Sequence, residues 1–426
     1  MVEYPHESLP KQTGAWSDLK AAYRFLNNPR VTPAQIGAAH RSWTWSRCAG
    51  QRVVLCVQDD TEIHGVKVAG GGGGEEGEVL HSTLAVRPSG ELLGLLDQRW
   101  FRHVEVAQGE TPLQRTARWR ESDVWEDAVR GLESLGAPPP ECRLLQVADR
   151  AADNLRFMHA SLQAKQGFVV RAQHDRLVNA GTDKLWGYLD RQVAAGTIHA
   201  QIGTQRDRSG KITRQGRPAA LVVRYATVLL DAPKNHPEEA AALRMQVVYL
   251  KEEDPPAGVE AVDWMILTSE PVVSFADACV IASYYQVRWT IEEWHRVLKE
   301  GCRLEESQVE TVLTLRRLSA LLSVVAVRLL QLRDLARGRA ASDAQALRAC
   351  ADPLWIKVVA LLAGLEAAVL TPQEFWQTIA RKGGFIGRKR DGMPGWKVIW
   401  RGWYDISQMV RYAEVLQSHS PPQNCG

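Results

Sequence analysis

Two runs of almost uninterrupted apolar residues, each followed by an aspartate, constrain the fold of this chain more than any other feature. The first run, residues 51–58, is rich in β-branched residues and stops at Asp59; the second, residues 143–148, stops at Asp149. Short apolar runs of this kind predict buried strands. A carboxylate at the carboxyl end of such a strand lies at the edge of a sheet, where metal sites are commonly built. We therefore expect an α/β fold with acids at one sheet edge.

Both aspartates also have an ordinary structural interpretation. Asp59 and its neighbour Asp60 could form a turn, and Asp60 competes with Asp59 for any role in a site. Asp149 could cap a helix that begins in the following residues. The two runs alone do not choose between these alternatives.

A third segment, residues 285–299, predicts a helix with two faces. At about 100° per residue, Tyr285, Arg288, Glu292 and Lys299 fall within roughly 60° of one another. A carboxylate can hold a divalent metal, and an arginine and a lysine beside it can hold phosphate oxygens. The alternative is a solvated helix face with internal ion pairs. The opposite side forms an apolar stripe of Val287, Ile291, Trp294 and Leu298.

The spacing of the four polar residues, Y-x2-R-x3-E-x6-K, resembles the signature of bacterial cut-and-paste DDE transposases of the insertion-sequence-4 family, the group that includes the transposon-five transposase. The resemblance implies a ribonuclease-H-like mixed sheet with a β-rich insertion and helical N- and C-terminal segments. It implies that Asp59, Asp149 and Glu292 are the catalytic acids and metal ligands. Close carboxylates need cations to remain ionised, so we expect two Mg²⁺ ions, with Mn²⁺ as a substitute.

The same resemblance implies which residues contact DNA: Tyr285, Arg288, Lys299, Arg171 and Trp264. Arg171 ends a short predicted strand, residues 167–171, and its alternative role is an ion pair at a sheet edge. Trp264 begins another predicted strand and would stack on a base flipped out of the duplex, although a core position is the commoner role of a tryptophan.

Three regions follow from the resemblance. Residues 1–50 are a partial helical N-terminal segment, shorter than the family's head that recognises transposon ends. Residues 51–330 are the catalytic domain, with the insertion at about 200–260. Residues 331–426 are a helical dimerisation region, in which Ile406 to Leu416 supply an apolar stripe that could instead pack within the chain.

A basic loop in the insertion could follow a phosphate backbone or be ordinary solvated surface; it carries Arg208, Lys211, Arg214 and Arg217. The net charge of the chain is only +3, so any nucleic-acid surface must be local. The seven cysteines show neither zinc-site spacing nor a disulfide framework, which favours a reducing compartment.

The expected protein is therefore a cytoplasmic, nucleoid-associated DNA transposase without a membrane role. Its partners are double-stranded DNA, as transposon ends and target, and a second copy of itself in a synaptic complex. Its expected reactions are 3′-end hydrolysis, hairpin formation and strand transfer. The alternatives are a catalytically idle DNA-binding or inhibitor protein derived from a transposase, and another two-metal nuclease.

Overall fold

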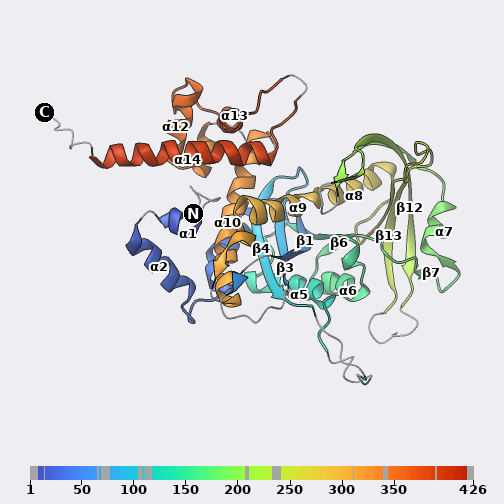
Figure 1. Ribbon diagram of the computed structural model, residues 1–426. Helices are drawn as coiled ribbons and strands as arrows, with labels where there is room; N and C mark the ends of the chain where they lie inside the picture. Colours follow the sequence, from blue (N-terminus) through green and yellow to red (C-terminus); the bar gives the residue numbers. More distant parts are fainter. Residues whose placement is uncertain are drawn as a thin grey trace.

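The computed structural model describes residues 8–13, 15–64, 67–68, 77–103, 109, 111, 118–206, 211–232, 241–309, 311–338, 344–388 and 391–419. Within these residues, eleven strands form one mixed sheet (Figure 1). The strands are β1 (Val53–Ile63), β3 (Glu78–Val86), β4 (Leu92–Phe101), β5 (Arg143–Ala148), β6 (Gly167–Arg171), β7 (Leu177–Val178), β8 (Asp183–Lys184), β9 (Gly196–Ile202), β12 (Arg217–Leu230), β13 (Leu243–Lys251) and β14 (Asp263–Thr268).

Two further pairs of short strands lie outside this sheet: β2 (Lys67–Val68) with β15 (Gln308–Val309), and β10 (Gln205–Arg206) with β11 (Ile212–Arg214). The helices are α1 (Leu9–Thr13), α2 (Trp16–Leu26), α3 (Pro33–Cys48), α5 (Asp123–Gly131), α6 (Leu155–Gln163), α7 (Leu185–Asp190), α8 (Phe275–Val287), α9 (Trp289–Arg296), α10 (Val312–Ala336), α11 (Ala344–Cys350), α12 (Pro353–Ala363), α13 (Pro372–Lys382) and α14 (Trp396–His419). A π-helical turn, Val297–Gly301, continues α9.

The strand order is that of a ribonuclease-H-like core. In the order β4-β3-β1-β5-β6, the pairs β4-β3 and β3-β1 are antiparallel, whereas β1-β5 and β5-β6 are parallel. The expected α/β class with a mixed sheet is confirmed. The long strands of the expected β-rich insertion, β12 and β13, do not form a separate sheet, because β14 pairs with β6 and continues the same sheet through β13 and β12.

β1 is longer than the apolar run that predicted it. The run ends at Gln58, but the strand continues to Ile63 because β3 pairs with it along that whole length, with Asp59 opposite Ser82. Asp59 and Asp60 therefore lie within a strand, and the turn interpretation is wrong. The predicted bounds of β5 and β6 agree with the structure.

Alternation along β1 divides its side chains between two apolar layers. Leu55 and Val57 belong to the core cluster that includes residues of α8, α9 and α10, whereas Cys56 packs on the other face. A separate cluster beneath the sheet includes α5 and α6. Figure 1 shows α8 and α9 on one side of the sheet and α5 and α6 on the other.

Two helices near the ends of the chain begin at capping boxes. Thr32 and Gln35 form a capping box at the start of α3, and Thr371 and Glu374 form another at the start of α13. The long helix α10 packs against α3, β4 and α13. In Figure 1, α12, α13 and α14 form a group of their own at the end of the molecule away from β12.

Candidate active site

The parallel register of β1 and β5 places two of the predicted acids at the same height. Val57 pairs with Val147, so Asp59 and Asp149 each lie two residues beyond the last pair. Alternation puts Asp59 on the same face as Val57, toward α9. Asp149 follows the end of β5 and accepts a hydrogen bond from the Ala151 N–H through Oδ1 at 2.8 Å. The capping interaction considered for Asp149 therefore exists, and it coexists with a position beside Asp59.

The third acid arrives from α9 and is joined to Asp59 by an arginine. Arg288 Nη1 lies 3.2 Å from Asp59 Oδ2, and Arg288 Nη2 lies 2.5 Å from Glu292 Oε1. The side chains of Arg288 and Asp59 are 13% and 17% exposed, so this bridge is largely shielded from water. The guanidinium thus supplies the positive charge that the carboxylates need.

The electrostatics of Asp59 show how crowded the acids are. Burial raises the pKa of Asp59 to about 7; Arg288 opposes this, while Asp149 and Glu292 raise it further. Burial alone would lower the pKa of Arg288, yet Tyr285, Glu292 and Asp59 together raise it above its ordinary value. Both other predicted acids therefore lie close enough to Asp59 to raise its pKa.

The three carboxylates are suitable ligands for a hard divalent cation, but in the structure they are not arranged around one metal position. Carboxylate oxygens are the ligands that Mg²⁺ and Mn²⁺ prefer. Among the residues that the structure describes, no three His, Cys, Asp or Glu side chains converge as a ready metal-binding group. Arg288 holds oxygens of Asp59 and Glu292, so both carboxylates would have to exchange this guanidinium for a cation.

The polar segment from Tyr285 to Lys299 is not one regular helix. α8 ends at Val287, α9 begins at Trp289, and a π-helical turn follows Arg296. Of the predicted apolar stripe, Ile291, Trp294 and Leu298 are buried and Val287 is half-buried. The polar row also faces the protein, because Arg288, Glu292 and Lys299 all contact other residues of the site.

Lys299 lies at the far end of β1. Its Nζ donates to the Glu62 carbonyl at 2.7 Å and pairs with Glu305 Oε1 at 2.9 Å. Glu305 Oε1 also accepts the backbone N–H of His64 at 3.1 Å. This ammonium therefore marks the end of the acid-bearing strand, with one carboxylate beside it that the sequence did not single out.

The remaining predicted DNA contacts form one cluster. Trp264 and Tyr285 meet edge to face with ring centroids 6.1 Å apart. Arg171 lies near enough to Tyr285 for the phenol to affect its pKa, and it donates through Nη2 to the Asp263 carbonyl at 2.7 Å. Burial lowers the pKa of Arg171, and Tyr285 opposes that effect. Tyr285 is buried, whereas Trp264 and Arg171 are half-buried.

Asp60, the competitor of Asp59, faces the opposite side of the sheet. Its Oδ1 lies 2.5 Å from His81 Nδ1, and His81 Nε2 lies 2.9 Å from Gln58 Oε1. Gln58 donates to Gln146 on β5, which continues a buried polar chain across the strands. This chain was missed in the sequence; the polar residues at alternate positions 58 and 60 are its signal.

Fewer arginines of the expected basic loop are available to DNA than the sequence predicted. Arg217 makes two hydrogen bonds to Glu252, a buried residue, so its charge is compensated. Arg208 lies outside the described residues. The other two described members are Lys211, next to β11, and Arg214, the last residue of β11.

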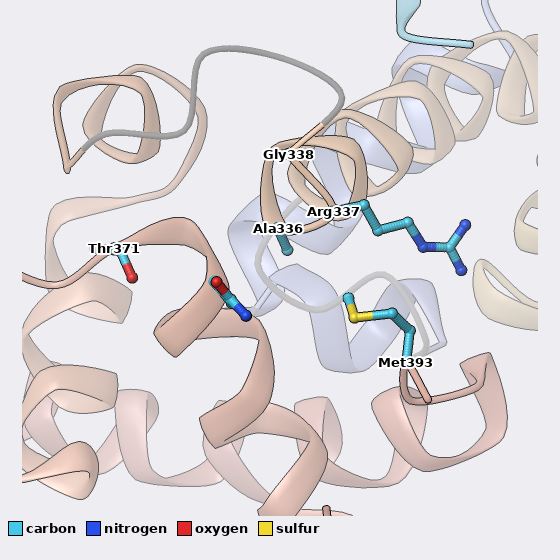
Figure 2. A pocket seen from close by; sticks show the side chains of 6 residues that line it. Ala336, Arg337, Gly338, Thr371 and Met393 are labelled. Atoms are coloured by element: carbon cyan, nitrogen blue, oxygen red, sulfur yellow. The ribbon is translucent and has the colours of Figure 1, made fainter. Parts of the chain in front are cut away.

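A pocket of about 330 Å³ lies elsewhere, between the end of α10 and the start of α13 (Figure 2). Its lining includes Ala336, Arg337, Gly338, Thr371 and Met393 but none of the predicted site residues.

A search of the described helices found none with the length and apolar character needed to cross a membrane.

Comparison with protein families gives two matches. Residues 1–31 match the family model described as transposase DNA-binding, and residues 324–422 match the Transposase Tn5 dimerisation domain. The two matches indicate a Tn5-like transposase and support DNA and a second copy of the chain as partners. The first match falls on the segment expected to be only a partial N-terminal head, and the second covers most of the expected dimerisation region.

Proposed function

We propose that this chain, whose two ends match domains of Tn5-like transposases, performs metal-dependent cut-and-paste transposition. The reactions are hydrolysis at the 3′ end of an element, hairpin formation on the opposite strand, and strand transfer into target DNA. The observation that supports the proposal is the Arg288 bridge between Asp59 and Glu292, beside strands β1 and β5, where Asp59 and Asp149 each lie two residues beyond the last pair of a ribonuclease-H-like sheet. We also propose that the chain belongs to the insertion-sequence-4 family of transposases.

The acids would hold the cations, and the basic residues would hold the DNA. Asp59, Asp149 and Glu292 would hold two Mg²⁺ ions, whose Lewis acidity activates the attacking oxygen and stabilises the leaving oxygen. The carboxyl of Asp59, with a pKa of about 7, must give up its proton for this purpose.

Arg288 changes partners in this scheme. In the structure it pairs with Asp59 and Glu292. Once cations take that role, its guanidinium is available to bind phosphate oxygens bidentately and to offset charge in the transition state. Lys299 at the end of β1 would contact the same strand of DNA.

The aromatic cluster would position the DNA end. Trp264 would stack on an unpaired base, and aromatic stacking of this kind offsets about 1–3 kcal/mol of the cost of flipping. Tyr285 and Arg171, which lie near each other, would contact the backbone beside it.

A DNA-cleavage assay tests the proposal, with the DNA that flanks the gene of this protein as the substrate. Wild type should nick a linear duplex carrying this DNA and then yield a hairpin, with Mg²⁺ or Mn²⁺ but not with EDTA. Asp149→Asn should bind the duplex and leave it intact, whereas Asp60→Asn, which changes a neighbouring carboxylate on the other face, should still cleave.

The rival functions give different products. Binding without cleavage by wild type in either metal would favour a catalytically idle DNA-binding protein. Nicks that never become hairpins would favour another two-metal nuclease. Metal-dependent cleavage by Asp149→Asn would refute the assignment of this acid.

A further inference from the structure

The region that matches the dimerisation domain also touches the segment that carries Glu292. Glu293, the next residue, accepts a hydrogen bond from Arg333 Nη1 at 2.5 Å. Arg333 belongs to α10 and lies within the matched residues 324–422. Its other nitrogens donate to Asp334 Oδ1 at 2.8 and 3.2 Å, and Asp334 Oδ2 accepts the Leu92 N–H of β4 at 3.1 Å.

The side chains of this network are largely buried, and each is held by charged partners. The side chains of Arg333 and Asp334 are each 1% exposed, and that of Glu293 is 18% exposed. A buried charge is tolerated only with its partners in place, so these groups hold one another at defined positions. α9 is thereby tied to α10 at the residue next to Glu292.

α14 contacts Arg333 of this network and the turn that follows α9. The ring of Trp396 lies under the Arg333 guanidinium, 5.7 Å from its Cζ, and stacks on Trp400 with centroids 5.1 Å apart. Trp400 lies against Gly301, where a Cβ would be 2.1 Å from its Cζ2. Gly301 is the last residue of the turn that carries Lys299. Its φ is not positive, so close approach, not backbone conformation, requires glycine there.

The base of α14 is itself held closely by α13. A Cβ at Gly383 would lie 1.9 Å from the Val398 carbonyl oxygen, and a Cβ at Gly402 would lie 1.8 Å from that of Ile379. The two backbones are therefore in contact on both sides of Trp400. A displacement of α14 would be passed to Trp400 and then to Gly301, because packed interiors deform little.

We propose that Arg333 and Trp400 are positioning residues, through which the dimerisation region sets the placement of Glu292 and Lys299. The inference rests on the proposed function for the roles of Glu292 and Lys299. Its consequence is that contact between two copies through the C-terminal region also orders the segment that completes the acid site. Dimerisation and catalysis are then coupled through side chains.

Hydrogen exchange of residues 289–301, followed by mass spectrometry on the full chain without DNA or metal, tests the coupling. Trp400→Leu should accelerate exchange in that segment on the order of tenfold and leave β1 unchanged. Trp355→Leu is the control, because Trp355 is a buried tryptophan of the C-terminal region that packs on Trp403, with centroids 4.6 Å apart. It should leave residues 289–301 as in wild type.

A compensation experiment separates positioning from general loss of packing. Gly301→Ala should also accelerate exchange, since its methyl group collides with Trp400. Combining it with Trp400→Leu should give a smaller effect than the two changes added together. Additive effects, or unchanged exchange in Trp400→Leu, would overturn the inference. Trp400→Phe, which keeps a ring against Gly301, serves if Trp400→Leu does not fold, and it should give a smaller acceleration.

Two other readouts distinguish this inference from the proposed function. Manganese affinity, measured by calorimetry without DNA, should fall in Trp400→Leu and in Gly301→Ala while the sedimenting dimer persists. If wild type never cleaves DNA, the proposed function fails, yet the exchange and manganese results still decide the coupling. If wild type cleaves, Trp400→Leu should lower the cleavage rate and keep DNA affinity.

Discussion

Replacing Asp59 with asparagine should change how stability depends on pH. Burial raises the pKa of Asp59 from 3.8 to about 7 in the folded protein, against the pull of Arg288. The folded state then binds this proton more tightly than the unfolded state does. The free energy of unfolding therefore falls as pH rises through the interval from 3.8 to about 7, and the loss is complete above it.

The size of the effect follows from the same interval. At 1.36 kcal/mol for each pH unit, the ionised Asp59 lowers the stability of the metal-free protein by about 4 kcal/mol at pH 8. Its side chain is 17% exposed, so solvent screens little of this cost. Asp59→Asn removes it but also leaves Arg288 with one carboxylate fewer, so the net gain at pH 8 is at most about 4 kcal/mol.

Urea unfolding followed by tryptophan fluorescence, between pH 4 and 8, measures the effect. Wild type should lose stability up to pH 7, and Mg²⁺ should restore it at pH 8 because cations replace the bound proton. Asp59→Asn should give a flatter curve and little response to Mg²⁺. Asp60→Asn, the control on the other face, should keep the response. An Asp59→Asn curve that runs parallel to wild type would refute the reasoning.

Three further changes have defined outcomes. Arg288→Met should weaken DNA binding about tenfold by loss of a charge-assisted contact, and should tighten Mn²⁺ binding in calorimetry because no guanidinium competes; unchanged Mn²⁺ affinity would contradict the exchange of partners. Leu416→Glu changes a side chain of α14 that is 70% exposed, and it should shift the sedimenting dimer toward monomer with the melting temperature unchanged. A dimer that persists would show that the exposed side of α14 at Leu416 is not the dimer interface. Trp264→Ala should slow hairpin formation by about 10- to 100-fold, and Trp264→Phe should retain most of it; equal rates would exclude stacking. The base flipping itself can be followed with 2-aminopurine fluorescence.

The bounds of strands were predicted best from the sequence where an apolar run ends at the same residue as the strand. β5 and β6 have the predicted bounds because apolar runs there end sharply at a polar residue. The end of β1 was predicted too early, since Asp59 and Asp60 are polar and only the pairing with β3 keeps them in the strand. Such long-range pairing is invisible in a window of a few residues.

The same limit applies to the site. Sequence spacing brought Arg288 and Glu292 together, because residues four apart share a helix face. It left Asp59 and Asp60 as rivals, and the alternation of side chains along β1 separates them. The Glu293–Arg333 contact joins residues 40 positions apart through tertiary packing alone, so no local pattern could predict it.

Anomalous diffraction from crystals soaked in Mn²⁺ tests the central claim most directly. The account predicts two manganese peaks about 3.5–4 Å apart, ligated by Asp59, Asp149 and Glu292, with Arg288 withdrawn from both of its present partners. Peaks elsewhere, or an intact bridge of Arg288 to Asp59 and Glu292 at saturating Mn²⁺, would contradict it.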